Sequence, residues 1–153
     1  MQNLDRHRLQ SDPKYKQHMD DLYKQFQALM VNFLKVAALI KFRKGCIIFE
    51  WPTNNKLWQE PLVHQLIRDY GLVKVHFNGC QLGLRSNRGQ AICKPWTFAT
   101  NIPTVVEMFS SLKCTRDHDH AVCSGDELRR TESYTPQMCT LLRLCINLSL
   151  IRI

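Results

Sequence analysis

The stretch from Gly45 to Asn101 decides the fold. It contains Gly45-Cys-Ile-Ile-Phe-Glu-Trp-Pro52, then Val73-Lys-Val-His-Phe-Asn-Gly-Cys80, and then Lys94-Pro-Trp-Thr-Phe-Ala-Thr-Asn101. Each segment holds an apolar run of strand length that is followed at once by Gly, Pro, Asn or a charged residue. Such runs are typical of buried strands whose carboxyl ends present polar groups at one edge of a sheet. We expect any functional site to lie at that edge.

Helical patterns surround these strands. Asp12 followed by Pro13 is a strong helix start, and apolar residues then recur at three- and four-residue steps as far as Arg43, with Gly45 as the stop. The pattern predicts one long amphipathic helix. Shorter helices are expected over residues 61–70, 103–112 and from 136 onward. For residues 141–153 the pattern leaves helix and strand open, because the segment is apolar on more than one face.

The order of these elements predicts the fold class. A strand, a helix and a second strand favour a right-handed crossover between parallel neighbours. The sequence therefore indicates an α/β fold, a partial Rossmann-like and mainly parallel sheet preceded by a long N-terminal helix. We expect residues 1–12 to be a disordered tail and residues 13–153 to form a single α/β domain.

The net charge, the apolar runs and the cysteine count limit which binding partners and which cellular compartment are expected. The formal net charge of +8 favours anionic partners, nucleic acid first, although ordinary surface lysines would give the same number. No run of eighteen uncharged apolar residues occurs, and the start of the chain does not look like a signal peptide, so we expect an intracellular protein without a membrane span. In that setting the seven cysteines favour free thiols or a metal site over disulfides.

Glu50 is the first candidate for chemistry. It directly follows Ile-Ile-Phe49 at the carboxyl end of an expected strand, where open α/β sheets bind ligands. Its carboxylate can accept from the donor edge of a flat heterocycle, while the neighbouring Trp51 offers a face for stacking. The alternative is a structural acid that is hydrogen-bonded to nearby amides.

The second candidate is a Cys/His loop with the pattern Cys114-x3-His118-x-His120-x2-Cys123. Two thiolates and two imidazoles suit tetrahedral zinc, and a short loop can turn all four inward. Cys80 is a possible replacement for one histidine. The alternative is a solvated loop with two half-buried cysteines.

The third candidate is a set of basic residues around an aromatic ring, namely Arg85, Arg88, Lys94 and Trp96. Basic side chains can hold a nucleic-acid backbone while the ring stacks on a base. A solvated basic loop beside a core tryptophan explains the same residues. The chain has no G-x-G-x-x-G, Walker or G-x-S-x-G motif, so the sequence offers no sign of a dinucleotide, phosphate-loop or serine-hydrolase site.

The order of these motifs resembles a known family. The chain has Phe49-Glu-Trp-Pro52, then His76-Phe-Asn-Gly-Cys80-x2-Gly83, then Lys94-Pro-Trp-x3-Thr-Asn101, then the Cys/His loop. This order is similar to the carboxyl-terminal half of phage-type DNA cytosine-C5 methyltransferases and to methyltransferase-like segments of retroelement polyproteins. The resemblance spans residues 26–136.

The resemblance implies roles for single residues. Glu50 matches the acid that holds the target cytosine, Pro52 shapes the turn after it, and Lys94 and Asn101 belong to the strand beyond. Trp51 stands where the family has Asn. Trp96 likewise replaces Thr, so two additional rings would crowd the base pocket.

The family's glycine-rich loop for S-adenosylmethionine and its Pro-Cys nucleophile have no counterpart in these residues. Without them C5 methylation has no mechanism, so no intact cofactor and no catalytic residue are expected.

Three functional hypotheses follow. The first is a non-catalytic methyltransferase-like fragment, derived from a mobile element, that contacts nucleic acid and lacks the N-terminal half of a longer polyprotein. The second is a zinc-stabilised nucleic-acid-binding module. The third is an interaction domain that uses the long helix, whose wide apolar face would need a partner if it is exposed.

Overall fold

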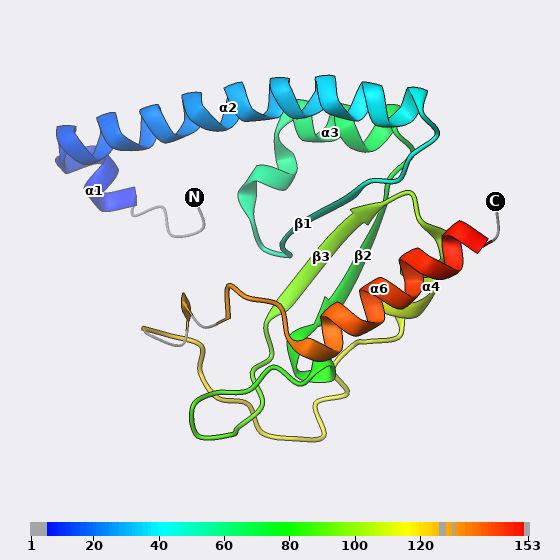
Figure 1. The fold of residues 1–153 in the computed structure, drawn as a ribbon. Coiled ribbons are helices and arrows are strands. Elements are labelled where there is room, and N and C mark those ends of the chain that lie inside the picture. The colour runs from blue at the N-terminus through cyan, green and yellow to red at the C-terminus, as the bar shows by residue number, and fades with distance from the viewer. Residues whose placement is uncertain (1–5, 126–127, 130, 152–153) are drawn as a thin grey trace. The chain divides into compact units, whose positions relative to one another are not determined.

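The structure, a computed structural model, describes residues 6–125, 128–129 and 131–151. These residues divide into two compact units, the first from residues 1–47 and 54–72 and the second from residues 48–53 and 73–153. The first unit (Figure 1) contains the helices α1 (Arg6–Ser11), α2 (Pro13–Phe42), the 3-10 turn η1 (Lys56–Gln59) and α3 (Pro61–Asp69). The second contains the strands β1 (Ile48–Pro52), β2 (Val73–Asn78) and β3 (Pro95–Thr100), the 3-10 turn η2 (Gly79–Leu82), and the helices α4 (Pro103–Ser110) and α6 (Pro136–Ile151).

Helix α2 begins and ends where the sequence predicts. The Asp12 carboxylate accepts hydrogen bonds from the backbone N–H groups of Lys14 and Tyr15, both at 3.1 Å. At the other end, Lys44 takes the left-handed conformation with φ 54°, and the Gly45 N–H donates to the Ile40 carbonyl at 2.8 Å. A Cβ on Gly45 would lie 2.8 Å from the Ile40 side chain, so a glycine is needed for this close approach.

Contacts between α2 and α3 hold the first unit together. The Tyr23 hydroxyl donates to the Glu60 carboxylate at 2.6 Å, and the Tyr70 hydroxyl donates to the Leu34 carbonyl at 3.3 Å. The buried residues of α2 and α3 are Met30, Ala37, Val63 and Leu66. Residues 6–11, part of the expected disordered tail, form α1. The single domain expected for residues 13–153 stays a prediction.

Helix α2 exposes much of its apolar surface. Its exposed large apolar side chains are Leu22, Leu29, Val31, Val36, Leu39 and Phe42. By length and composition alone α2 would also be long and apolar enough to cross a membrane, a test that core helices and signal sequences pass as well. The predicted absence of a membrane span and the predicted intracellular location therefore stay predictions.

The second unit is built on a three-stranded antiparallel sheet in the order β1-β3-β2 (Figure 1). Strand β3 lies in the middle and pairs antiparallel with both neighbours. The predicted partial Rossmann-like, mainly parallel sheet is therefore wrong. Strands β1 and β2 do run in the same direction, but they are not neighbours, because β3 lies between them.

A signal for the antiparallel arrangement is present in β2. Its residues alternate between exposed and buried, with Val75 and Phe77 buried and Lys74 and His76 exposed. Such alternation is typical of antiparallel strands with one solvated face, whereas parallel strands read as continuous apolar runs. One part of the prediction survives in altered form: the carboxyl ends of β1 and β2 both lie at the start of β3, where Pro52 pairs with Trp96 and Asn78 with Pro95.

Aromatic side chains form the core of the second unit. The ring of Phe77 lies 4.7 Å from that of Phe98 and 5.0 Å from that of Phe109, measured between centroids. Helix α4 packs on β2 and α6 packs on α4, and the buried Thr104 hydroxyl of α4 donates to the Cys145 carbonyl of α6 at 2.8 Å. The described part of the tail that the sequence left open is helical as far as Ile151.

Candidate metal centre

The antiparallel pairing of β2 with β3 brings two cysteines together. Asn78 at the end of β2 pairs with Pro95 at the start of β3. Beyond this pair the Gly79 N–H still donates to the Lys94 carbonyl at 2.8 Å. The strand pairing ends there, and the next residue on each segment is a cysteine, Cys80 in η2 and Cys93 before β3, whose sulfur atoms lie within 4.8 Å of each other.

The segment after α4 supplies two further ligands. The Cys114 N–H donates to the Asn78 side-chain oxygen at 2.9 Å, so the segment is fixed to the end of β2. Six residues later His120 forms a parallel bridge with Ala91, and the Ala121 N–H donates to the Ala91 carbonyl at 2.8 Å. Backbone hydrogen bonds therefore position both ends of this loop.

The four side chains Cys80, Cys93, Cys114 and His120 form a cluster whose ligand atoms all lie within 4.8 Å of one another. The Cys114 Sγ and the His120 Nε2 are 3.4 Å apart. In a tetrahedral zinc site the ligand atoms are about 3.4–3.8 Å apart, as bond lengths of about 2.3 Å to sulfur and 2.0 Å to nitrogen require. The widest separation in the cluster, up to 4.8 Å, therefore exceeds that of a closed zinc site by about 1 Å.

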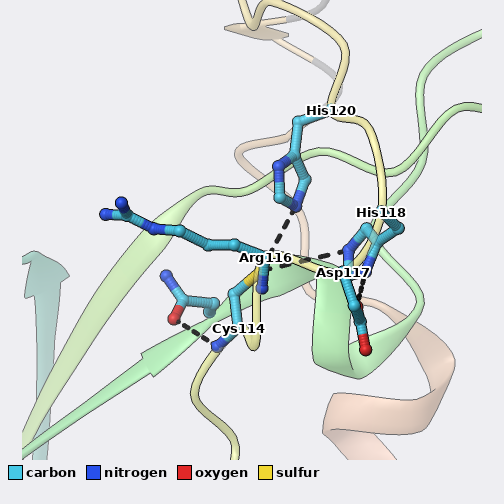
Figure 2. Close-up of polar contacts among 6 residues, drawn as sticks. Cys114, Arg116, Asp117, His118 and His120 are labelled. Atoms are coloured by element: carbon cyan, nitrogen blue, oxygen red, sulfur yellow. Dashed lines mark hydrogen bonds and ion pairs between the residues drawn. The ribbon is translucent and has the colours of Figure 1, made fainter.

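The turn after Cys114 is shaped around its sulfur. The Arg116 N–H donates to the Cys114 Sγ at 3.3 Å, and Arg116 takes the left-handed conformation with φ 61°. Figure 2 shows the Arg116 side chain extending away from the sulfur, while His120 and His118 point toward it. The His118 Nε2 lies 4.0 Å from the Cys114 Sγ, and its Nδ1 bonds the Asp117 carboxylate at 2.7 Å.

Asn78 supports two of the ligands. Its side-chain oxygen accepts from the Cys114 backbone, and its side-chain N–H donates to the Cys93 Sγ at 3.5 Å. N–H donors to thiolate sulfur are part of the outer shell that orients metal ligands and tunes their charge. The sequence did not single out Asn78, which bonds two members of the cluster.

Burial and the proximity of other thiols raise the pKa of Cys80 and Cys93 when no cation is bound. Burial, followed by hydrogen bonding to Cys114, raises the pKa of the Cys80 thiol to about 12. Burial is also the largest cause of the raised pKa of Cys93, with the nearby Cys114 second. A bound divalent cation reverses this preference, because coordination deprotonates a thiol outright. The site is therefore chemically suited to a soft divalent metal.

The structure brings together part of the predicted metal set. Cys114 and His120 belong to the cluster, and so does Cys80, the proposed replacement for a histidine. His118 lies beside the cluster and bonds Asp117, while the Cys123 Sγ lies 3.5 Å from the Thr131 hydroxyl. Cys93 was missed, because a parallel sheet would not bring it close to Cys80.

Glu50 lies within β1 and is hydrogen-bonded. One carboxylate oxygen accepts from the Tyr134 hydroxyl at 3.1 Å, whereas the other is shielded from solvent and has no hydrogen-bond partner among the described residues. Burial raises the pKa of Glu50, and the Tyr134 bond and the charge of Lys94 only partly oppose it. Burial, then the charge of Glu50, raises the pKa of Tyr134. Glu50 and Tyr134 thus form a half-buried pair.

Two of the other predicted substrate-binding residues lie toward Glu50, since the charge of Lys94 lowers the pKa of Glu50 and the Trp96 ring lies 6.3 Å from the ring of Tyr134, which bonds Glu50. The Trp96 ring is 2% exposed and belongs to the core, and the half-buried Trp51 contacts Phe49 edge-on at 4.5 Å. Pro52 ends β1 near the start of β3, whereas Asn101 follows the far end of β3.

The predicted nucleic-acid residues lie in different settings. The Lys94 Nζ donates to the Thr131 carbonyl at 2.6 Å and lies 5.5 Å from the centroid of the Trp96 ring. Arg85 and Arg88 are exposed in a separate loop, where the Arg85 guanidinium donates to the Gly89 carbonyl at 3.1 Å. Lys94 is therefore engaged internally, whereas the two arginines face solvent.

Comparisons with models of protein families, with characterised proteins and with solved structures gave no match to this chain.

Proposed function

We propose that this chain is a zinc-stabilised nucleic-acid-binding module in which Cys80, Cys93, Cys114 and His120 hold one Zn²⁺ ion. The observation that carries the proposal is the convergence of these four ligand atoms within 4.8 Å. Three thiolates and one imidazole are a common structural zinc set, and soft sulfur ligands select zinc over magnesium or calcium.

The metal's role in this proposal is structural. Four protein ligands complete a tetrahedral shell and leave no open position for water or substrate. The ligands come from the end of β2, the approach to β3 and the loop after α4, so one ion would link three segments that are far apart in the sequence. Metal binding and folding of these segments are then coupled, because the site does not exist in the unfolded chain.

Charge supports nucleic acid as the partner. The chain has 21 Lys and Arg against 13 Asp and Glu, and the exposed Lys113 and Arg116 flank the metal ligand Cys114. Phosphate contacts are made mostly by such side chains. The metal would hold the turn that carries Arg116, so the proposal joins the two roles at one place.

Metal analysis tests the zinc part. Protein purified without added zinc should contain one equivalent per chain, and Cys93→Ser should lose most of it. Cys139→Ser is the matched control, because Cys139 is an exposed free cysteine of α6 outside the cluster. Substoichiometric zinc together with unchanged melting in the presence of a chelator would contradict the proposal.

Titration of labelled single- and double-stranded oligonucleotides at several salt concentrations tests the nucleic-acid part. Binding should weaken linearly on a log–log plot against salt, because each phosphate contact releases counterions. Absence of binding even at low salt would refute this part while leaving the zinc site intact.

The methyltransferase resemblance stays a prediction. The mainly parallel sheet that the antiparallel β1-β3-β2 order contradicts was predicted separately, from the order of the strands and helices. The resemblance's expectation of no methyl transfer is tested by incubating the chain with labelled S-adenosylmethionine and DNA, and specific transfer would refute it. The origin within a mobile-element polyprotein and the interaction-domain hypothesis likewise stay predictions.

A further inference from the structure

A cavity of about 300 Å³ lies beside the metal cluster. Its walls come from the end of β1, the end of β2, the start of β3 and the residues on either side of Cys114. Two ligands of the cluster, Cys93 and Cys114, line it, and so does Asn78, which bonds both. The cavity and the proposed metal site therefore share a wall.

The charged side chains that line this cavity are cations, and they outnumber the net charge of about −1 that three thiolates and one Zn²⁺ would leave on the neighbouring cluster. Lys113 and Arg116 line it, and no carboxylate is among the described residues that do. The structure records no ion pair of either cation with a carboxylate in the described part of the chain. Asp117, the nearest acid in sequence, bonds His118 instead. Two cations with no acid among the lining residues favour an anionic ligand.

A short hydrogen-bond chain provides polar groups on another wall. The Thr97 hydroxyl lies 2.8 Å from the Thr53 hydroxyl and 2.7 Å from the His76 Nδ1. Thr97 has one hydroxyl hydrogen and two lone pairs, and where it donates to one of these neighbours it accepts from the other. With a neutral histidine, either direction leaves Thr53 and His76 with one further donor and one further acceptor between them. Both residues line the cavity, so it offers the paired donor and acceptor that a nucleobase edge requires.

We propose that this cavity binds one nucleotide of a single-stranded nucleic acid, with its phosphate held by Lys113 and Arg116 and its base edge by Thr53 and His76. The cavity is at the lower end of the size range of ligand pockets, about 300–1,000 Å³, which suits one nucleotide and excludes a duplex. The inference rests on the proposed nucleic-acid function and assigns its contact site. In this proposal the metal ion also contributes to nucleotide binding, because it would fix Cys114, which lies between Lys113 and Arg116 in the sequence.

A matched pair of double variants tests the phosphate contacts. Lys113→Gln with Arg116→Gln removes two charges at the cavity, and Lys14→Gln with Lys16→Gln removes two exposed charges from α2 in the other unit. The cavity variant should bind a single-stranded oligonucleotide at least about tenfold more weakly, and its salt slope should fall by about two. The α2 variant should stay within about threefold of the unmodified chain. Equal losses in both variants would overturn the proposal.

Two further measurements separate this proposal from the broader function. In nuclear magnetic resonance spectra of the zinc-loaded chain, a nucleoside monophosphate should shift the signals of His76 and Arg116, and the nucleoside alone should shift them much less. Thr53→Val, which removes only the hydroxyl, should reduce discrimination among the four bases and leave the zinc content unchanged.

The outcomes distinguish the two levels of inference. If the chain binds the oligonucleotide but the monophosphate shifts neither residue, the cavity is not the site. If the monophosphate binds at His76 and Arg116 while no oligonucleotide binds, the cavity proposal stands and the polymer-binding function fails. If neither ligand binds, both fail.

Discussion

The two units of this chain differ in what holds them together. In the first unit, the thirty-residue helix α2 has only Met30 and Ala37 buried among its described residues, and most of its hydrogen bonds are internal to the helix. In the second, short strands surround the buried rings of Phe77, Phe98 and Phe109, and a Cys/His cluster joins distant segments. The first unit therefore depends on local structure, and the second on contacts between residues far apart in the sequence.

Metal removal should give the largest difference in response between the two units. A chelator should raise amide hydrogen exchange over residues 78–94 and 112–121, because these segments carry the ligands, and should leave residues 13–42 nearly unchanged. Hydrogen-exchange mass spectrometry measures this region by region. A uniform rise across both units would show that they unfold together.

Truncation of the aromatic core should have the next largest effect. Phe98 is fully buried and contacts two other rings, so Phe98→Ala should lower the free energy of unfolding by about 3–5 kcal/mol. The counterpart in the first unit is Leu39→Ala, since Leu39 is 56% exposed on α2 and its truncation should change stability by about 0.5 kcal/mol or less. Urea unfolding of both variants makes the comparison. A large loss in Leu39→Ala would show that something covers the exposed face of α2.

The pH dependence of Glu50→Gln tests the half-buried acid of the second unit. Because burial raises the pKa of Glu50 above 4.5, the folded state holds its proton to higher pH than the unfolded state. The free-energy cost of ionising Glu50 in the folded state is absent well below pH 4.5 and appears as the pH rises through the folded-state pKa of Glu50. Gln cannot ionise, so the Tm of the variant relative to the unmodified chain should be about 2 °C higher near about pH 7 than near about pH 4. A difference that does not vary with pH would contradict the raised pKa.

The N-cap of α2 should give the smallest effect. Asp12→Ala removes the side-chain acceptor for the Lys14 and Tyr15 amides, so the first turn should fray and the helical circular-dichroism signal should fall slightly. Asp12→Asn is the control, since Asn caps about as well as Asp. Zinc content should stay the same in both. A loss of zinc in Asp12→Ala would indicate coupling between the units.

Features that depend on local sequence were predicted better than features that depend on contacts between distant residues. The bounds of α2, the helix beginning at Pro61 and the approximate positions of β2 and β3 were predicted correctly, because caps, glycines and apolar periodicity act over a few residues. The first strand was expected to end before Glu50, but Glu50 lies in the middle of β1. The sheet direction was wrong, since the strand–helix–strand order was taken to mean that β1 and β2 are neighbours. The alternation in Val73-Lys-Val-His-Phe77 was the overlooked signal.

The candidate metal site was also predicted only as far as local spacing allowed. Cys114 and His120 were predicted from their spacing within one loop, which is local information. Cys93 could be identified only from the pairing of Asn78 with Pro95, which brings Cys80 and Cys93 close to each other. For Trp96 the sequence left open a base-stacking ring and a core tryptophan, and the ring is buried in the core.

The sequence by itself determined the helices, the strand segments, the basic charge and the supply of soft metal ligands, since these follow from residue type and short-range spacing. Only the tertiary structure decided which strand lies in the middle, which cysteines meet, and that Lys113 and Arg116 line a cavity beside them. The physical reason is that strand pairing is made by backbone groups common to every residue. Register and direction therefore depend on how distant side chains pack, and the site is formed by that packing.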